Sequence, residues 1–147
     1  MNKSTAVLIF IDSEGNILLQ ERGYYSKTGE KHGYFGGNIE KGEKPKDCLI
    51  RELKEEIDYI PPRIRFWKKI EFLCTAEGKC KNQVVAVYIF VSPLTKEAEE
   101  VRVYEGEGVI KTTLNKELES ENITGGYEIV LKEIKNHLAE VIRMKGS

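Results

Sequence analysis

The sequence predicts an α+β domain in which helices pack on a mixed β-sheet. Strand-sized apolar runs occur near the N-terminus and in the middle of the chain, helical periodicity occurs at 45–57 and 127–144, and Gly or Pro clusters separate these segments. Elements in this order bury their apolar sides by packing helices against a sheet. The 147 residues are expected to form one domain, 1–147, because two smaller domains would each bury too little surface.

The chain is predicted to open with a β-hairpin. Thr5–Ile11 is dense in β-branched and aromatic residues, and Ile17–Glu21 follows a turn cluster in which Gly15 permits a positive φ. The polar segment Gly23–Gly33 is long enough to be a functional loop rather than a tight connector.

Pro45–Ile57 is the first predicted helix. Pro45 suits the first helical position, where its missing N–H costs nothing, and Asp47 lies near the positive end of the helix dipole. Pro61 and Pro62 prevent the helix from continuing.

Three strand regions and a helix are predicted after it. The segments 65–75 and 83–91 form a hairpin with a turn at 77–79. Val101–Thr113 is a further strand region, whose internal glycines indicate a bulge or a close backbone approach. Apolar residues at helical spacing predict a C-terminal amphipathic helix over Tyr127–Met144.

Composition excludes several classes of protein. With 40% hydrophobic and 32% charged residues the chain is typical of a soluble globular protein, and its net charge of −1 argues against a duplex nucleic acid as partner. No apolar run approaches the roughly 20 residues of a membrane helix, and no signal-peptide core follows Met1, so we expect a cytoplasmic protein.

The cysteines and histidines are not expected to form a metal site. Cys48, Cys74 and Cys80 are odd in number and lack CxxC spacing, which predicts reduced thiols rather than disulfides or a zinc site. His32 and His137 have no spacing typical of a metal site, and we expect both at the surface.

Three glutamates share one face of the first predicted helix. Glu52, Glu55 and Glu56 fall at i, i+3 and i+4, whereas Leu49 and Leu53 fall on a separate stripe that can face a core. Like charges one turn apart destabilise a helix by a few tenths of a kcal/mol. Taken alone, this face is either a solvated acidic surface or a site for a hard cation, which prefers oxygen ligands.

The residues before the helix favour the second interpretation. Gly37 is followed at fixed spacing by a glutamate, an arginine and the glutamate cluster, which resembles the Nudix box G-x5-E-x7-R-E-U-x-E-E-x-G-U, where U is a bulky aliphatic residue. The matching positions are Gly37, Glu43, Arg51, Glu52, Leu53, Glu55 and Glu56. Asp58 stands where the family has Gly, and Tyr59 where it has an aliphatic residue, so both departures lie at the helix exit.

The resemblance to Nudix hydrolases implies a fold and an activity. The implied fold is an α/β/α sandwich around a mixed β-sheet. The implied activity is Mg²⁺-dependent hydrolysis of a nucleoside diphosphate linked to a group X, with Mn²⁺ as an alternative cofactor, in which water attacks a phosphorus atom.

The resemblance also implies roles for individual residues. Glu55 and Glu56 match the main metal ligands, the backbone carbonyl of Gly36 matches a further ligand, and Glu52 matches a position that is either a ligand or the general base.

The resemblance also implies a supporting pair, a further metal ligand and a substrate-binding residue. Glu43 and Arg51 resemble a pair that fixes the loop against the helix. Glu105 is the expected downstream carboxylate ligand, with Glu107 as the alternative, and Arg22 is expected to meet substrate phosphate.

The resemblance leaves the substrate open. A (d)NTP pyrophosphatase of the sanitising, 8-oxo-dGTP diphosphatase type is the first expectation, although Asn122 is out of register with the base-reading asparagine of that branch. ADP-ribose, nucleotide-sugar and dinucleoside polyphosphate hydrolysis are alternatives, and a non-catalytic nucleotide-binding module is an alternative of another class. The expected partner is a small-molecule nucleotide, and the chain is compatible with a homodimer.

Overall fold

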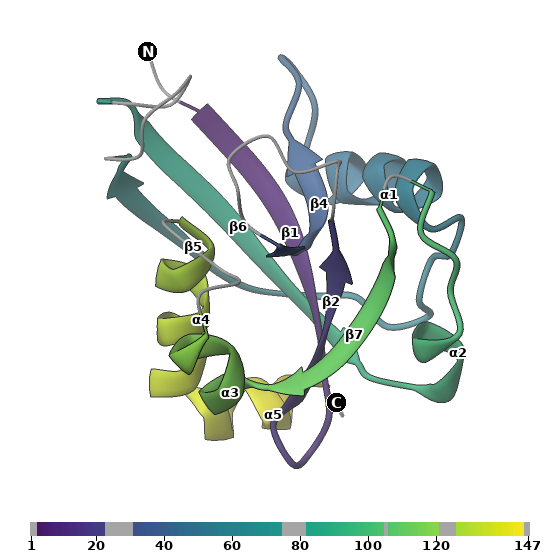
Figure 1. Cartoon of the computed structure of the whole chain (residues 1–147). Helices are drawn as coiled ribbons and strands as arrows, with labels where there is room; N and C mark the ends of the chain where they lie inside the picture. Colours follow the sequence, from purple (N-terminus) through teal and green to yellow (C-terminus); the bar gives the residue numbers. More distant parts are fainter. Residues whose placement is uncertain (1–2, 23–30, 75–81, 105, 121–125, 146–147) are drawn as a thin grey trace.

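A mixed sheet forms the centre of the molecule (Figure 1). The computed structural model describes residues 3–22, 31–74, 82–104, 106–120 and 126–145. The strands of this part of the chain are β1 (Lys3–Ile11), β2 (Asn16–Glu21), β3 (His32–Gly33), β4 (Phe35–Asn38), β5 (Arg65–Leu73), β6 (Val84–Pro93) and β7 (Gly108–Thr113). Its helices are α1 (Pro45–Glu56), α2 (Lys96–Glu99), α3 (Leu114–Glu119), α4 (Gly126–Asn136) and α5 (Leu138–Lys145).

The strand order is β3-β2-β1-β6-β5, with β4 added to β1 and β7 added to β2. β1 and β6 are parallel along their whole shared length, whereas the other pairs are antiparallel. The predicted mixed sheet is therefore confirmed, as is the antiparallel pairing of the two long strands in the middle of the chain.

One edge of β1 is shared between two strands. Phe10 and Ile11 pair with β2, whereas the segment Thr5–Leu8 pairs with β4. This fork brings Gly36 opposite Val7 in the middle of the sheet, beside α1.

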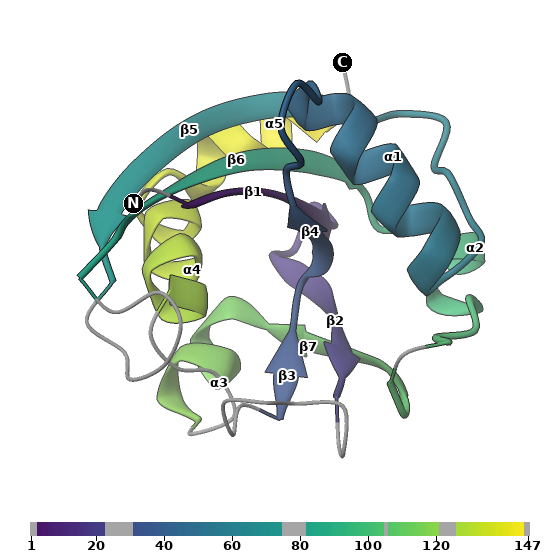
Figure 2. The same cartoon turned by 90° about the horizontal axis from the view of Figure 1, so that it is seen from above.

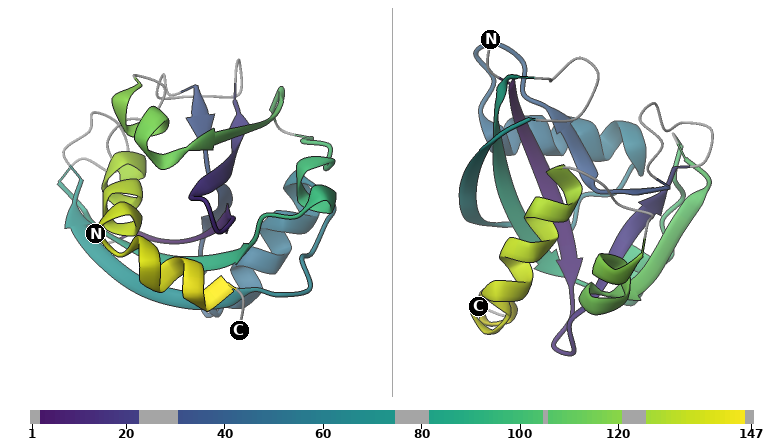
Figure 3. Two further views of the ribbon diagram at one scale, coloured as in Figure 1. Left: turned by 90° about the horizontal axis from the view of Figure 1, so that it is seen from below. Right: turned by 60° about the vertical axis from the view of Figure 1, so that its left-hand side comes forward.

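Helices cover both faces of the sheet, as the α/β/α expectation requires. Figure 2 shows α1 on one side of the strands and α4 on the other, and the right-hand view of Figure 3 shows α4 in front of β1 with α1 behind it. Alternate residues of β1 enter the two cores, since Ile9 packs toward the C-terminal helices and Leu8 packs toward Leu49 and Leu53 of α1.

The sequence did not predict four short elements. β3 lies at the end of the expected loop, no element was predicted for the residues of β4, and α2 and α3 are shorter than the window in which helical periodicity can be recognised. Both short helices begin with a threonine cap: Thr95 Oγ1 accepts a hydrogen bond from Ala98 N at 3.2 Å, and Thr113 Oγ1 accepts one from Lys116 N at 3.1 Å.

Two predicted elements differ in their extent. Residues 101–104 are not a strand, and among the described residues of the expected strand region only Gly108–Thr113 pairs, with β2. The C-terminal helix divides into α4 and α5 at His137, whose N–H donates to Ile134 O at 3.1 Å and so closes a tighter turn. The expected turn at 77–79 lies outside the described residues.

The expectations for His32 and Cys74 were wrong. His32 is buried, and its Nδ1 lies 2.6 Å from Oε2 of Glu117, which is 85 positions away in the chain and also buried. Cys74 is disulfide-bonded, whereas Cys48 is the expected buried free thiol. The third cysteine, Cys80, lies outside the described residues.

In the described part of the chain, no helix has the length and apolar character needed to cross a membrane.

Candidate functional site

The glutamate face of α1 lies beside the Gly36–Gly37 backbone. Leu49 and Leu53 are fully buried and fix the rotation of the helix against β1 and β4. At about 100° of rotation per residue, Glu56 lies nearest to this stripe, Glu52 lies further round the helix and Glu55 lies furthest, so Glu56 reaches the edge of the buried face while Glu55 points outward. Burial of the leucines thus determines where the carboxylates point.

Glu56 is the most enclosed of the three glutamates. Only 5% of the residue is exposed, and both oxygens of its carboxylate accept hydrogen bonds. Gly36 N donates to Oε1 at 2.8 Å, and Gln20 Nε2 donates to Oε2 at 3.0 Å. A buried carboxylate without such donors would carry a large desolvation penalty.

The Glu52 carboxylate occupies the space beside Gly37. A Cβ built on Gly37 would lie 2.5 Å from Glu52 Cδ, so a larger residue at position 37 would displace this carboxylate. Glu52 Oε1 accepts a hydrogen bond from Arg51 Nη1 at 3.0 Å, and its side chain is 18% exposed. Glu55 lies further out, with 54% of its side chain exposed and Oε1 at 3.9 Å from the same nitrogen of Arg51.

Arg51 and Glu43 connect the helix to the loop that precedes it. Arg51 Nε donates to Glu43 Oε2 at 2.9 Å, and Arg51 Nη2 donates to Glu43 Oε1 at 3.1 Å and to Asn38 O at 3.2 Å. These hydrogen bonds from Arg51, together with one from Glu40 N, lower the pKa of Glu43 to about 2. The pair therefore fixes the end of β4 against α1, as expected of a loop-fixing pair.

The buried thiol of Cys48 contacts the backbone at the end of β4. Its thiol lies 3.3 Å from Asn38 O and 3.6 Å from Gly37 O, within the range of weak sulfur hydrogen bonds. Burial, followed by the nearby Glu43 carboxylate, raises the pKa of the Cys48 thiol to about 11. The thiol thus stays protonated at neutral pH and serves as a packed donor rather than a nucleophile.

The segment before β7 approaches the same place. Tyr104 N donates to Glu56 O at 2.8 Å, and Glu107 N donates to Glu21 O at 2.7 Å. A Cβ on Gly106 would lie 2.8 Å from that oxygen of Glu21, which confirms the close backbone approach expected near this glycine. Glu105 itself lies outside the described residues.

Arg22 lies at the end of β2, next to β3. A Cβ on Gly33 would lie 2.8 Å from Arg22 Cδ, so the guanidinium stem packs across this glycine. Arg22 N also donates to Lys31 O at 2.8 Å, and these residues bound the segment 23–30, which lies outside the described residues.

The carboxylates of α1 suit a hard divalent cation in their chemistry. Their donors are all carboxylate oxygens, which Mg²⁺ and Mn²⁺ prefer, and the backbone of Gly36 lies directly beside them. Among the described residues, no group of three His, Cys, Asp or Glu side chains already converges in metal-binding geometry. Instead, Glu52 contacts Arg51, and Glu55 is exposed near the same arginine.

Gln20 was missed by the sequence reasoning. It lies in β2 among apolar residues, is 1% exposed, and touches the Glu56 carboxylate directly. A polar residue at an inward position of a strand was the available signal, because a buried amide requires partners.

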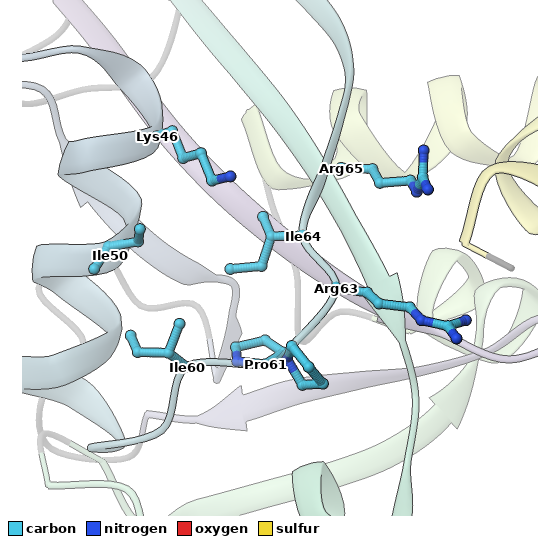
Figure 4. Close-up of a pocket in the computed structure, with 8 residues that line it drawn as sticks. Lys46, Ile50, Ile60, Pro61, Arg63, Ile64 and Arg65 are labelled. Atoms are coloured by element: carbon cyan, nitrogen blue, oxygen red, sulfur yellow. The ribbon is translucent and has the colours of Figure 1, made fainter. Parts of the chain in front are cut away.

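A surface depression lies on the other flank of α1. It measures about 400 Å³ and lies between α1 and the segment 60–65. In Figure 4, Ile50 and Ile64 point into this space, whereas Arg63 and Arg65 extend away from α1. The glutamates do not line it, so it is separate from the site described above.

Comparison with known proteins identifies the family. The NUDIX domain family model matches residues 1–112, which include the whole forked sheet region around β4 and all of α1. The chain belongs to the Nudix family.

Three relatives illustrate the similarity. The 8-oxo-dGTP diphosphatase of Escherichia coli (strain K12) is 31% identical over 67 residues, covering 46% of this Nudix chain and about half (52%) of that relative. The MutT protein from Methanosarcina mazei Go1 has a TM-score of 0.70 and 18% identity over 93% of this chain and 95% of its own. The NUDIX domain of Shewanella oneidensis NrtR, solved in complex with ADP-ribose, has a TM-score of 0.66 and 17% identity, over 94% and 89% of the two chains.

These structures confirm the expected Nudix fold, a mixed sheet with flanking helices. At these low identities they show the fold alone. The roles of the site residues therefore depend on the geometry described above.

Proposed function

We propose that this Nudix protein is a Mg²⁺-dependent nucleotide pyrophosphohydrolase. The substrate class that we propose for it is nucleoside and deoxynucleoside triphosphates of the 8-oxo-dGTP type. The observation that carries the proposal is that the Glu52 and Glu56 carboxylates both lie against the Gly36–Gly37 backbone, beneath the exposed Glu55. The substrate is supported by the similarity to 8-oxo-dGTP diphosphatase over about half of that relative. In this proposal residues 1–147 act as one domain.

The proposed metal ligands are the carboxylates of Glu52, Glu55 and Glu56 together with the carbonyl of Gly36. Glu105 is proposed to add a ligand, because its neighbours Tyr104 and Gly106 lie beside Glu56 and β2. When bound, Mg²⁺ neutralises phosphate charge and lowers the pKa of a coordinated water.

Side chains of this site are proposed to accept the proton of the attacking water and to bind the substrate phosphate. Water adds to a phosphorus atom of the anhydride, the P–O bond to the leaving phosphate breaks, and the water proton passes to a carboxylate. Glu56 is held by two donors, so the more exposed Glu52 and Glu55 are the proposed proton acceptors. Arg22 is proposed to bind substrate phosphate, where a guanidinium can form two hydrogen bonds.

Two other functions are alternatives to this proposal. Hydrolysis of ADP-ribose, a nucleotide sugar or a dinucleoside polyphosphate uses the same carboxylates, and the NUDIX domain of NrtR was solved with ADP-ribose. A non-catalytic nucleotide-binding module is less well supported, because the chain keeps Glu52, Glu55 and Glu56 on one helix face.

The test is a panel of nucleotides incubated with the purified protein and MgCl₂ in H₂¹⁸O, with products identified by mass. The panel holds dGTP, 8-oxo-dGTP, the other (d)NTPs, ADP-ribose, a nucleotide sugar and a dinucleoside tetraphosphate. We expect a nucleoside monophosphate and pyrophosphate from a triphosphate, and the ¹⁸O label identifies the attacked phosphorus. Binding without turnover of any compound would support the non-catalytic module and contradict the proposal.

A further inference from the structure

Gln20 is a buried polar residue on the face of β2 that packs toward α1. It is 1% exposed, and Leu18 on the same face is equally buried in the apolar cluster under α1. Burying an amide among apolar side chains costs free energy unless its donors and acceptors find partners. Gln20 is therefore expected to have a specific partner.

Both hydrogens of the Gln20 amide are used. Nε2 donates to Tyr34 O at 3.0 Å and to Glu56 Oε2 at 3.0 Å. A backbone carbonyl and a carboxylate can only accept, so the nitrogen, not the oxygen, must face both groups. The amide thus has one orientation, and it joins β2, the residue before β4, and α1.

This amide completes the support of the Glu56 carboxylate. Gly36 N binds Oε1 and Gln20 binds Oε2, while Tyr104 N binds the main-chain oxygen of Glu56. The two donors to the carboxylate, one from the backbone and one from a side chain, come from different strands. The carboxylate is therefore fixed in rotation as well as in position.

We infer that Gln20 is a positioning residue that sets the divalent-cation affinity of the site by holding the Glu56 carboxylate in one rotamer. The inference rests on the proposed function, in which Glu56 is a metal ligand. Groups that orient metal ligands typically change metal affinity or activity by about 10–100-fold when they are replaced.

The first test replaces Gln20 with an apolar residue of similar length. Gln20→Met removes both donors, and we expect the Kd for Mn²⁺, measured by electron paramagnetic resonance without nucleotide, to rise about tenfold. We also expect kcat to fall, with little change in KM for the nucleotide. Leu18→Ala is the matched control, because Leu18 is buried on the same face of β2. This substitution should lower the Tm and leave the Kd for Mn²⁺ unchanged.

A double-mutant cycle separates positioning from general support of the fold. If Gln20 acts through Glu56, then Gln20→Met should have no further effect on Mn²⁺ affinity in the Glu56→Ala background. Additive effects of the two substitutions would overturn the inference, as would an unchanged Kd in Gln20→Met alone.

The same measurements distinguish this inference from the proposed function. A wild-type protein that binds Mn²⁺ and cleaves nucleotides while Gln20→Met matches it would refute only the role of Gln20. A wild-type protein that binds Mn²⁺ without cleaving any nucleotide would refute the hydrolase, and the binding cycle would still decide the role of Gln20. A wild-type protein that binds no Mn²⁺ would refute both.

Discussion

The guanidinium of Arg51 binds the carboxylate of Glu43 through two hydrogen bonds, from Nε to Oε2 at 2.9 Å and from Nη2 to Oε1 at 3.1 Å. The same guanidinium lies 3.0 Å from Glu52 Oε1 through Nη1. One arginine thus fixes the loop before α1 and also binds the carboxylate of a proposed metal ligand. These contacts make the stability of the loop depend on pH.

Replacing Glu43 should remove a pH-dependent part of the stability. The pKa of Glu43 is about 2 in the folded protein and 4.5 as the ordinary value, so its ionised form favours the folded state. This stabilisation is complete above about pH 5 and is lost as the pH falls through the folded pKa. The Tm of Glu43→Gln should therefore lie a few degrees below wild type at pH 7, and the difference should shrink toward pH 2.

Glu40→Gln is the control for that experiment. Glu40 is also near Arg51, but its Oε1 lies 3.8 Å away and 71% of its side chain is exposed, so solvent screens the pair. We expect its Tm to follow wild type at every pH. A difference between Glu43→Gln and wild type that stays constant from pH 7 to pH 2.5, measured by circular dichroism, would contradict the assignment of the low pKa.

Adding a methyl group at Gly37 should displace the Glu52 carboxylate without unfolding the protein. The new Cβ would meet the end of the Glu52 side chain, which can move, and no backbone atom is among its nearest neighbours. We expect Gly37→Ala to keep its Tm within a few degrees and to lose at least about tenfold in kcat, as for removal of an oriented ligand. Steady-state kinetics and thermal melts on one preparation measure both quantities.

Gly36→Ala is the contrasting variant at the neighbouring position. Gly36 has a φ of +132°, and its added Cβ would lie 2.0 Å from Ala6 O in the adjacent strand. Both effects act on the backbone, so we expect a loss of more than about 3 kcal/mol in the free energy of unfolding. If Gly36→Ala proved as stable as Gly37→Ala, that result would contradict the close approach of β4 to β1 at Gly36.

Glu56→Gln and Glu55→Gln should differ in stability although both lower activity. At position 56 an amide must turn its NH₂ group toward either Gly36 N–H or Gln20 Nε2, which leaves buried donors unsatisfied at a cost of about 1–3 kcal/mol. At position 55 the side chain is half exposed, so the free energy of unfolding should change by less than about 0.5 kcal/mol.

The activity of the two glutamine variants is measured at saturating MgCl₂. We expect Glu56→Gln to lose at least about 100-fold in kcat, as for loss of a charge-stabilising group. Full activity in that variant would exclude Glu56 from the site. Equal stability of the two variants would instead contradict the burial of the Glu56 carboxylate.

The sequence predicted the parts of the molecule that local chemistry determines. Helix α1 has its proline, its apolar stripe and its glutamates within 12 residues, so its position and exposed faces could be read from spacing alone. The hairpin of β1 and β2 was predicted for the same reason, since a turn cluster separates two apolar runs.

The parts that were missed depend on contacts between distant residues. His32 and Glu117 are 85 positions apart, so neither histidine burial nor its partner follows from local pattern. The pairing of β4 with β1 requires the sheet to fork, and Gln20 acquires its role only because that fork brings Tyr34 and Glu56 to it. Tertiary pairing, rather than propensity, determined these features.

Restoring the family glycine at position 58 should stabilise the protein without changing its chemistry. Asp58 follows the C-cap Ile57 and has a φ of +48°, in the left-handed region that ends many helices and that favours glycine. Side chains with a Cβ adopt this conformation at a cost of about 1 kcal/mol, which glycine does not have. Part of this gain is offset because glycine also makes the unfolded chain more flexible. We therefore expect Asp58→Gly to raise the Tm by a few degrees and to leave kcat and KM unchanged.

Asp58→Ala is the matched control, because it removes the carboxylate while keeping the Cβ, and it should not raise the Tm. A Tm gain of the same size in Asp58→Ala would show that the charge of Asp58, and not its backbone conformation, destabilises the end of α1.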